Sequence, residues 1–277
     1  MSKNKLVKPF VKWAGGKRQL MDEILKYVPK SISTYYEPFL GGGAVWFELQ
    51  PKTYVVNDIN SEMINVYRTI QTDVDALIAE LKQFRNEEET FYQVREQDRS
   101  PEFQNLSSVQ RAARIIFLNK TCFNGLFRVN SQGFFNVPFG RYKNPDITNE
   151  ATLRAVNSYL KKAKGEIRNV DFAEAVADAQ PGSFIYLDPP YDPVSDSSSF
   201  TGYTLDGFGR QEQERLKRLC DDLHNRGCQF LVSNSATPFI KELYADYNIE
   251  IVQANRAINS VGANRGRVDE VLIWNKL

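Results

Sequence analysis

Apolar positions follow two periods along the chain, and together they predict alternating strands and helices. Short, nearly continuous apolar runs predict strands, whereas apolar residues about 3.6 positions apart predict helices. The expected strands cover residues 35–39, 54–58, 165–170, 183–188, 229–233, 249–254 and 268–274. The expected helices cover residues 44–49, 61–83, 90–99, 108–121, 172–179, 210–225 and 238–247.

This order of elements is typical of an α/β protein with an open sheet. Successive β/α units imply largely parallel strands with helices on both faces. No helix separates the last two expected strands, so we expect them to form an antiparallel hairpin at the edge of the sheet. A mainly helical block interrupts the alternation. We therefore expect one domain made of residues 1–60 and 165–277 and an inserted domain made of residues 61–164.

The net charge is +1, from 35 Lys and Arg against 34 Asp and Glu, and by itself it argues against a polyanionic partner. Its distribution along the chain argues the opposite. Residues 1–30 have a net charge of +6 and residues 111–168 have +8, whereas residues 58–102 have −6. Two blocks are therefore basic enough to bind a nucleic acid.

The cysteine and histidine content excludes several kinds of chemistry. The three cysteines form no C-x-x-C pair, and the one histidine, His224, lies in an expected helix. We therefore expect neither a Ser-His-Asp triad nor a metal site. The chemistry should instead use carboxylates, backbone groups or a cofactor. The N-terminus has no signal-like pattern and no apolar run reaches about 18 residues, so we expect a cytoplasmic protein without a membrane segment.

The sharpest chemical signal is Asp188-Pro189-Pro190-Tyr191, directly after the apolar run 184–187. Ligands in open α/β sheets bind at the carboxyl ends of strands, where this tetrapeptide is expected. Two consecutive prolines stiffen the turn, because each fixes φ and lacks an N–H. The loop then presents a carboxylate, the Pro189 carbonyl and an aromatic face. The plainer alternative is a turn that only ends a strand.

These three groups suit the activation of an exocyclic amino group on a nucleobase. The lone pair of such an amine is delocalised into the ring. Two acceptors directed at its two N–H bonds favour the pyramidal, nucleophilic geometry and stabilise the charge that develops during attack. Tyr191 can stack on the base once the base has left the duplex. We therefore interpret Asp188, Pro189 and Tyr191 as catalytic residues.

A second group of motifs is typical of a nucleotide-binding βαβ unit. Glycines 41–43 lie between an expected strand and an expected helix, so a ligand can approach the backbone there. Asp58 ends the next strand, where an acid commonly accepts hydrogen bonds from ribose hydroxyls. Residues 12–17, KWAGGK, add two more glycines between lysines. A simple turn remains the alternative for each glycine motif, and a P-loop is excluded because no G-x-x-x-x-G-K-[ST] occurs.

Six motifs in this order resemble the Dam-type, alpha-group DNA adenine-N6 methyltransferases, which include GATC-specific modification methylases. They are KWAGGK (12–17), EPFLGGG (37–43), ND (57–58), FNGLFRVNSQGFFNVPFGRY (123–142), DPPY (188–191) and the R-G-x-x-D-E-V run (265–271). The resemblance spans nearly the whole chain. It implies a Rossmann-like class I methyltransferase sheet and an inserted, mainly helical target-recognition domain with a β-hairpin.

The resemblance also implies an activity and a cofactor. S-adenosylmethionine would donate a methyl group to the adenine amino group of double-stranded DNA, at GATC, after base flipping and by direct in-line attack, without a metal. Asp188 and Tyr191 would bind and activate the adenine. The residues implied for the cofactor are Trp13, Lys17, Phe39, Gly41, Gly43, Asp58, Asp171, Phe172 and Asp188.

Further residues match the family's DNA contacts. Lys12 matches a lysine that contacts the first base of the site, and Arg128 matches a position that reads bases. A bidentate contact from Arg128 to guanine would provide about 1–3 kcal/mol of discrimination. Phe123 stands where Dam-type relatives can have Tyr, which puts a hydroxyl role there in doubt. The full implied set is Lys12, Phe123, Asn124, Leu126, Arg128, Pro138 and Tyr142.

The chemistry of this basic segment agrees with contact to DNA. Leu126 and Phe127 can wedge into the duplex or contact apolar base surface. Cationic side chains there can bind phosphates, which gives affinity without sequence information. The residues that suit this role are Arg111, Arg114, Lys120, Arg141 and Lys143.

Other functions fit less well. Cytosine-C5 methylation needs a cysteine nucleophile, typically after a proline, and here the cysteines follow Thr, Leu and Gly. Cytosine-N4 methyltransferases use the same amine chemistry but more often have Ser where Asp188 stands. This alternative and a catalytically silent DNA-binding relative stay open. We expect a monomer in solution, and more than one copy on DNA is compatible with the sequence.

Overall fold

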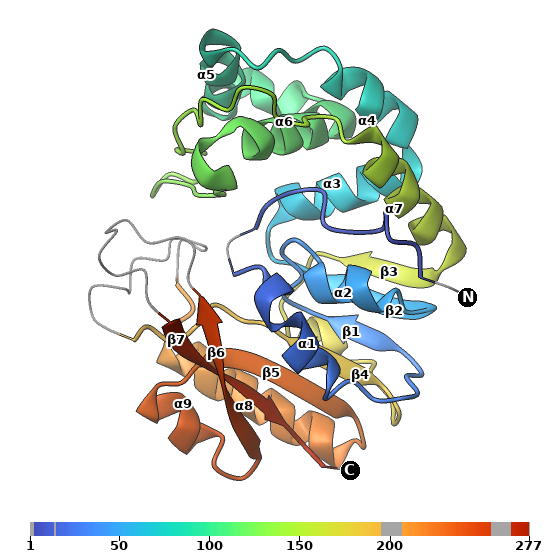
Figure 1. The fold of residues 1–277 in the computed structure, drawn as a ribbon, viewed down its shortest axis with the longest axis vertical. Coiled ribbons are helices and arrows are strands. Elements are labelled where there is room, and N and C mark those ends of the chain that lie inside the picture. The colour runs from blue at the N-terminus through green and yellow to red at the C-terminus, as the bar shows by residue number, and fades with distance from the viewer. Residues whose placement is uncertain (1–2, 14, 195–206, 256–266, 277) are drawn as a thin grey trace. The chain divides into compact units, whose positions relative to one another are not determined.

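Seven strands form one sheet in the part of the chain that the structure describes, in the order β3-β2-β1-β4-β5-β7-β6 (Figure 1). The structure is a computed structural model, and it describes residues 3–13, 15–194, 207–255 and 267–276. The strands are β1 (Tyr35–Glu37), β2 (Thr53–Asn57), β3 (Lys164–Arg168), β4 (Phe184–Leu187), β5 (Gln229–Ser235), β6 (Asn248–Asn255) and β7 (Arg267–Trp274).

The strand directions confirm the expected α/β arrangement. β1 pairs in parallel with β2 and β4, and β4 pairs in parallel with β5, so that Ile185 lies opposite both Tyr36 and Phe230. β7 is antiparallel to both β5 and β6, which confirms the expected terminal hairpin. β7 nevertheless lies between β5 and β6, so β6 rather than β7 forms that edge of the sheet.

Several helices begin where the local sequence supplies a cap. At the start of α6 the Ser107 hydroxyl accepts the Gln110 N–H and the Gln110 side chain accepts the Ser107 N–H, a capping box. At the start of α3 the Asn60 side chain accepts the Met63 N–H. The described α-helices are α1 (Met21–Leu25), α2 (Ala44–Leu49), α3 (Ser61–Thr72), α4 (Val74–Leu81), α5 (Glu88–Glu96), α6 (Ser108–Thr121), α7 (Glu150–Lys162), α8 (Arg210–Asn225) and α9 (Pro238–Leu243). The 3₁₀ turns are η1 (Lys17–Leu20), η2 (Gln97–Arg99), η3 (Pro101–Asn105), η4 (Phe123–Gly125) and η5 (Glu174–Val176).

Two expected helices differ from the observed ones. The helix expected over residues 61–83 is divided into α3 and α4 at Asp73, whose backbone (φ −133°, ψ 44°) leaves the helical region. The helix expected over residues 172–179 is only the three-residue turn η5. In this segment the N–H groups of Val176, Ala177 and Ala179 bond to carbonyls three residues back, which is the 3₁₀ pattern. The Asp171 carboxylate accepts the Ala173 N–H in an Asx turn, and Arg226 donates to the carbonyls of Val176, Ala177 and Ala179.

The chain divides into two units. Unit 1 comprises Met1–Gly16, Leu40–Lys52 and Asn57–Val170, and unit 2 comprises Lys17–Phe39, Thr53–Val56 and Asp171–Leu277. In unit 2, Leu216 and Leu223 of α8 pack with Val232 of β5 and Ile273 of β7 in one apolar cluster. Trp274 follows Ile273 on β7 and therefore faces the other side of the sheet, where Tyr27 packs against it with ring centroids 4.1 Å apart. Chain segments thus cover both faces of the sheet in unit 2.

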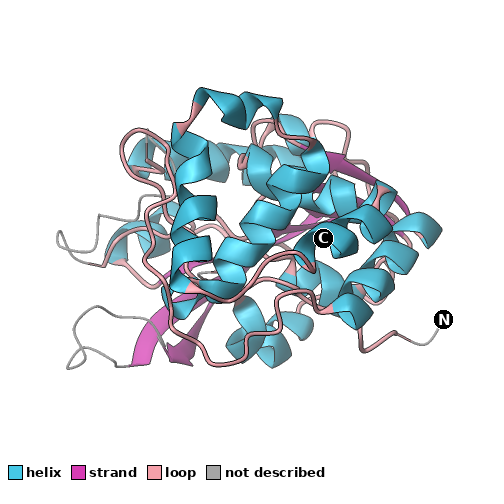
Figure 2. Cartoon of the chain, turned by 90° about the horizontal axis from the view of Figure 1, so that it is seen from above, coloured by secondary structure: helices cyan, strands magenta, loops and turns pink. Residues whose placement is uncertain are grey.

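Unit 1 is mainly helical. α3, α4 and α5 each contact α6, and α7 contacts α3 and α4 (Figure 1). Seen from above, helices, drawn in cyan, make up most of the visible chain (Figure 2). The segment after α6 adds Phe135 and Val137 to the core formed with Phe91 and Phe117. The hairpin that the resemblance implies is present here in a short form. It has one antiparallel bridge, Val129 to Phe135, with a backbone hydrogen bond on either side.

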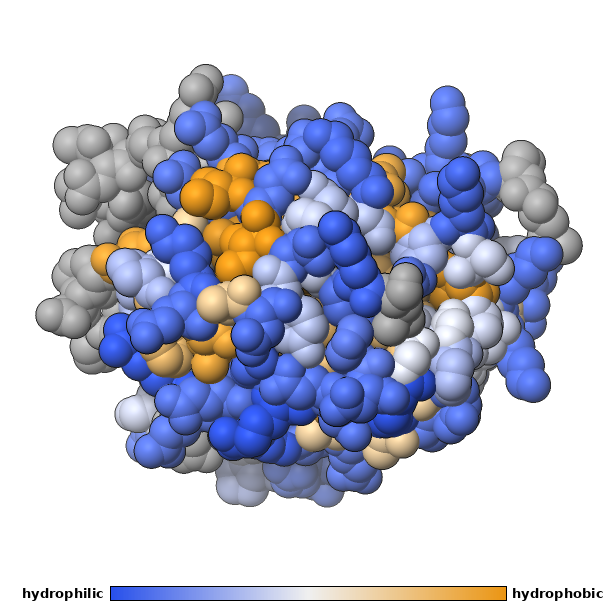
Figure 3. Space-filling view, turned by 90° about the horizontal axis from the view of Figure 1, so that it is seen from below, coloured by the Kyte–Doolittle hydropathy of each residue, from blue (hydrophilic) through white to orange (hydrophobic). Residues whose placement is uncertain are grey.

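Within the described ranges, no helix is both long enough and apolar enough to cross a membrane. Figure 3 shows one face of the molecule, where hydrophilic residues cover most of the visible surface and hydrophobic residues appear in smaller groups between them.

Candidate functional site

The Asp188 carboxylate directly follows β4 in unit 2, as its sequence predicts, and it has two buried partners. Its Oδ1 accepts the Ser233 hydroxyl of β5 at 2.9 Å and forms an ion pair with the Lys17 ammonium at 2.8 Å. The Lys17 side chain is only 6% exposed and that of Asp188 is 20% exposed. Burial raises the pKa of Asp188, while Lys17 and Ser233 act in the opposite direction.

The loop leaves two acceptor atoms for a ligand. Both contacts of Asp188 go to Oδ1, and no residue that the structure describes bonds to Oδ2. No described residue bonds to the carbonyl of Pro189 either, whereas the carbonyl of Pro190 accepts a hydrogen bond from Gln213. A carboxylate oxygen and a neighbouring carbonyl are the acceptor pair that an exocyclic amine requires.

Tyr191 is fixed at both its ring and its hydroxyl. The hydroxyl donates to Glu270 Oε2 on β7 at 2.8 Å, and the Lys17 ammonium lies 4.8 Å from the ring centroid. Because Lys17 covers one face of the ring, a base can stack only on the other face. Lys17, which the resemblance assigns to the cofactor, therefore contacts the side chains of both Asp188 and Tyr191 in unit 2.

Buried amides hold the rest of this loop. Gln213 of α8 donates to the Pro190 carbonyl at 2.8 Å and accepts from Asn234 at 3.0 Å, and Asn234 in turn accepts the Asp192 N–H at 3.0 Å. Gln213 and Asn234 have no exposed surface. A loop whose backbone groups are satisfied by buried side chains keeps its geometry when a substrate binds.

Sequence reasoning did not identify four of these partners. Ser233, Gln213, Asn234 and Glu270 lie far from DPPY in the sequence and reach it only through the sheet order and the packing of α8. One signal was available. Polar residues 233–235 directly follow an apolar run, so they lie at the carboxyl end of a strand, where ligands bind in such sheets.

An aromatic group in unit 2 includes two of the residues implied for the cofactor. The rings of Phe39 and Phe172 stack with centroids 5.2 Å apart, and Phe208 contacts both of them. Arg215 lies over the Phe172 ring at 4.4 Å and pairs with Asp171. Burial of Asp171 raises its pKa, but the hydrogen bonds from Arg215 and the Ala173 N–H outweigh this effect and hold that pKa below its usual value.

Unit 1 contains the glycine loop and Asp58. The Asp58 carboxylate accepts the N–H of Gly41 on one oxygen at 2.8 Å and the N–H of Asn60 on the other at 2.9 Å. Each oxygen retains a second lone pair for a ligand hydroxyl. Burial raises the pKa of Asp58, and these two N–H groups oppose the rise.

The glycines are also required by a side chain of the protein itself. A Cβ on Gly41 would lie 2.6 Å from Trp13 Cδ1, and a Cβ on Gly42 would lie 3.0 Å from Trp13 Cβ. Gly43 has φ +66° and precedes α2, a conformation that favours glycine. Trp13 therefore packs directly on the glycine loop.

In unit 1 the segments matched to DNA contacts lie together. The Lys12 ammonium lies 5.0 Å from the centroid of the Tyr142 ring, and the two residues line a cavity of about 380 Å³ with Lys120 and Lys143. The Phe123 N–H donates to the Pro138 carbonyl at 2.8 Å, and the Phe123 side chain is 51% exposed.

Comparison with known proteins decides the family. The family model described as D12 class N6 adenine-specific DNA methyltransferase matches residues 13–258. The chain belongs to this family of adenine-specific DNA methyltransferases. The motifs that we compared with the Dam type are thus those of an enzyme that methylates adenine at N6 in DNA, and its sheet is a class I methyltransferase sheet. The cytosine-N4 alternative is not supported.

Named relatives match nearly the whole length of this methyltransferase. It is 42% identical over 278 residues to the type II methyltransferase M1.LlaDCHI of Lactococcus lactis subsp. cremoris, with 99% of this chain and 98% of the relative covered. It is 42% identical to the type II methyltransferase M.MjaIII of Methanocaldococcus jannaschii, with 97% and 99% covered. It is 34% identical to the DNA adenine methylase of Escherichia coli (strain K12), with 98% and 95% covered.

Two apolar residues of the methyltransferase that are candidates for contact with base surface, Leu126 and Phe127, are half-buried. Leu126 and Phe127 pack against the apolar core of unit 1, and Phe127 stacks on Trp13 with ring centroids 5.2 Å apart. Phe123 is the aromatic residue of this segment with an exposed side chain. Arg128 is also exposed, and its Nε donates to Asn136 Oδ1 at 2.7 Å, which orients the guanidinium.

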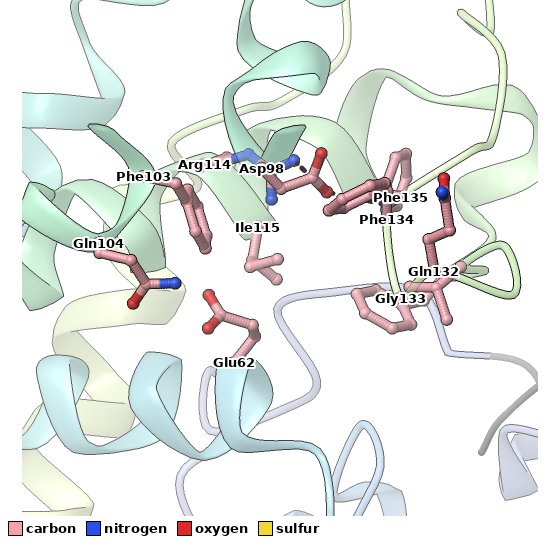
Figure 4. A pocket seen from close by; sticks show the side chains of 12 residues that line it. Glu62, Asp98, Phe103, Gln104, Arg114, Ile115, Gln132, Gly133, Phe134 and Phe135 are labelled. Carbon is pink, nitrogen blue, oxygen red and sulfur yellow. Dashed lines mark hydrogen bonds and ion pairs between the residues drawn. The ribbon is translucent and has the colours of Figure 1, made fainter. Parts of the chain in front are cut away.

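A second cavity of unit 1, of about 240 Å³, is lined in part by Arg114 and Asp98 (Figure 4). Arg114 pairs with Asp98 at 2.8 Å and its side chain is only 3% exposed, so the prediction that it binds phosphate is wrong. Arg111 forms an ion pair with Glu62, which lines the same cavity. Asp98 also accepts the N–H of Phe135, which attaches the short hairpin to the helical core.

Metal ligands are not grouped in the described part of the methyltransferase. No cluster of three or more His, Cys, Asp or Glu side chains there could hold a metal ion. The motif at 265–271 is described only in part, because residues 265 and 266 lie outside the described residues.

Proposed function

We propose that this methyltransferase uses S-adenosylmethionine to methylate adenine in double-stranded GATC sites after flipping the adenine out of the duplex. The family establishes methyl transfer to adenine N6 of DNA. The proposal adds the methyl donor, the target sequence and the route by which the adenine reaches Asp188.

The residues present fit S-adenosylmethionine. Asp58 has lone pairs available for ribose hydroxyls, and the glycines after Phe39 let a ligand approach the backbone. The stacked rings of Phe39 and Phe172 are suited to an adenine ring, and Asp171 beside them is a hydrogen-bond acceptor. When bound, the cofactor supplies an electrophilic methyl group on a sulfonium.

One observation supports the catalytic step above all. Asp188 Oδ1 is engaged by Lys17 and Ser233, which orients the carboxylate so that Oδ2 and the Pro189 carbonyl remain for the two N–H bonds of the adenine amine. Accepting both hydrogens localises the lone pair on nitrogen and stabilises the positive charge that forms as the nitrogen attacks. The free face of Tyr191 stacks on the flipped base.

Sequence recognition is proposed for the inserted segment, residues 61–164, together with Lys12. Arg128 is exposed, and its Nε and Nη2 donate to the side chain and the carbonyl of Asn136, which orients the guanidinium that we assign to a guanine edge. We assign to Lys12 a contact with the first base of the site. The match of residues 123–142 to the Dam-type motif is what supports GATC. We propose that the enzyme is a monomer in solution.

A plasmid assay tests the proposal. Plasmid DNA is incubated with enzyme and S-adenosylmethionine and then digested with nucleases that differ in their sensitivity to methylated GATC. We expect protection only from the nuclease that methylation blocks, and protection that fails without the cofactor. Incorporation of methyl groups at unrelated sites would contradict the GATC assignment. A rise in 2-aminopurine fluorescence, when that base replaces the target adenine, tests base flipping.

A further inference from the structure

Asn119, in the last turn of α6, makes three hydrogen bonds to the backbone of two other segments. Its Oδ1 accepts the Lys12 N–H at 2.8 Å, and its Nδ2 donates to the Lys12 carbonyl at 2.7 Å and to the Gly125 carbonyl at 3.0 Å. The residue is 2% exposed. One buried amide thus satisfies both backbone polar groups of Lys12 and joins them to the turn η4.

The same residues are in close contact through their side chains. A Cβ on Gly125 would lie 2.5 Å from Lys12 Cδ, so the lysine stem passes directly over this glycine. The Lys12 ammonium then lies over the Tyr142 ring at 5.0 Å. Lys12 is therefore fixed at its backbone by Asn119, along its stem by Gly125 and near its charge by Tyr142.

We propose that Asn119 is a positioning residue for sequence recognition, which holds Lys12 so that its ammonium meets the first base of the target site. The inference rests on the proposed role of Lys12. Lysine is a flexible point charge with a long stem, so discrimination between bases depends on where its backbone is held. Lys12 lies outside any helix or strand, and hence no secondary-structure ladder fixes it.

A purely structural role would have a different signature. Asn157 on α7 is a matched control, because it is also a buried amide and donates to two backbone carbonyls, those of Ile70 and Gln71. Its contacts join α7 to α3 and involve none of the residues assigned to DNA. Loss of either amide should lower stability, because buried carbonyls lose their donors. Only loss of the Asn119 amide should change which base is accepted.

The test compares kcat/KM on duplexes that contain GATC or a single changed base pair. The variants are Lys12→Ala, Asn119→Asp, Asn119→Ala, Asn157→Asp and the double variant Lys12→Ala with Asn119→Ala. We expect the single changes at Lys12 and Asn119 to lower discrimination at the first base about tenfold, the scale of one base contact. Discrimination at the other bases should stay within about twofold, and the double variant should lose no more than Lys12→Ala, because the two changes remove one interaction.

A second pair of variants reaches Lys12 without changing Asn119. Gly125→Ala places a Cβ against the Lys12 stem at φ +64°, whereas Gly133→Ala has a similar backbone strain at φ +83° but no atom within 4 Å of the added Cβ. We expect Gly125→Ala, and not Gly133→Ala, to lower discrimination at the first base. Thermal unfolding shows which variants are folded. If Asn119→Asp is not folded, this pair still tests the inference.

The outcomes separate the inference from the proposed function. If the wild type does not discriminate at the first base, or Lys12→Ala leaves that discrimination intact, the proposed role of Lys12 is wrong and the inference is overturned with it. If Lys12→Ala removes discrimination but folded Asn119 and Gly125 variants retain it, only the inference is overturned. Equal losses at all bases in the Asn119 and Asn157 variants would likewise show that Asn119 is only structural.

Discussion

The Lys17 ammonium lies 2.8 Å from Asp188 Oδ1 and 4.8 Å from the centroid of the Tyr191 ring, so one buried cation contacts both side chains proposed to bind the target adenine. Lys17 is the last residue of the KWAGGK motif and begins η1. The ion pair compensates for part of the cost of burying the carboxylate, favours its ionised form and orients it. The N-terminal motif of this methyltransferase therefore takes part directly in the electrostatics of the DPPY loop.

Removal of the Asp188 carboxylate should abolish methylation without abolishing DNA binding. We expect Asp188→Ala to lower kcat by at least about 10²-fold, because one of the two acceptors for the adenine amine is lost. Turnover on GATC duplex and binding by fluorescence anisotropy measure the two effects. Glu214→Gln, an exposed change on α8, is the control and should leave both unchanged. A near-normal rate for Asp188→Ala would show that the carboxylate is not catalytic.

Replacement of Lys17 should move the acidic limb of the pH–rate profile. Asp188 must be ionised to accept the amine hydrogens, so activity falls as the pH falls through its pKa. Burial already raises this pKa and Lys17 opposes the rise, so Lys17→Met should raise it further. We expect the acidic limb of kcat to move to higher pH by about one unit or more. Lys17→Arg, which keeps the charge, should retain more of the wild-type profile. An unchanged limb in Lys17→Met would contradict the coupling.

The ring of Tyr191 should matter more than its hydroxyl. The hydroxyl donates to Glu270 and orients the ring, whereas the ring face is proposed to stack on the flipped base. We expect Tyr191→Phe to lower kcat less than about tenfold and Tyr191→Ala to lower it by about a further tenfold, as the loss of one base–aromatic stack predicts. Turnover and the 2-aminopurine signal, measured together, distinguish loss of stacking from loss of chemistry. Equal losses in the two variants would assign the role to the hydroxyl.

The positions of Asp188 and Tyr191 could be predicted because they depend on local sequence, namely an apolar strand followed by a proline-stiffened turn. Their partners could not. Ser233 reaches Asp188 because β5 lies beside β4, and Glu270 reaches Tyr191 because β7 lies between β5 and β6. Strand order is a tertiary property, and the spacing of apolar residues does not encode it.

The helices, too, could be predicted where a local signal sets their ends. α6 matches its expected bounds because Ser107 and Gln110 form a local cap. The helix expected over 172–179 is instead a 3₁₀ turn, in which the N–H groups of Val176, Ala177 and Ala179 donate to carbonyls three residues back. Capping residues thus place the ends of a helix, whereas the spacing of apolar residues does not distinguish an α-helix from a 3₁₀ turn.

Arg128 and Lys143 should affect DNA binding in different ways. Arg128 is proposed to read a guanine, so Arg128→Ala should lower the preference for GATC over a scrambled duplex by about 10-fold or more. Lys143 is proposed to contact phosphate, so Lys143→Ala should weaken binding to both duplexes about equally and reduce the slope of log K against log salt by about one. Binding constants for both duplexes at several salt concentrations provide the measurement. Equal losses on the two duplexes for Arg128→Ala would exclude base reading.

Arg114 should contribute to stability rather than to DNA affinity. Its guanidinium pairs with Asp98 and donates to the backbone carbonyls of Val94 and Arg95. Arg114→Ala leaves the largely buried Asp98 carboxylate with Arg99 as its remaining cationic partner, so the cost should approach, but not exceed, the value of about 3–5 kcal/mol for a fully broken buried pair. Arg154→Ala is the control, because its ion pairs with Asp75 and Glu150 are exposed and such pairs contribute about 0–1 kcal/mol.

Urea unfolding at constant pH measures the two free energies. We expect a large decrease in the midpoint for Arg114→Ala and a small one for Arg154→Ala. Where Arg114→Ala remains folded, the slope of log K against log salt for DNA binding should equal that of the wild type. A side chain that is 3% exposed does not contact phosphate and therefore releases no counterion from the DNA. A reduced salt slope together with normal stability would instead return Arg114 to the set of phosphate contacts, and the ion pair with Asp98 would then have to open when DNA binds.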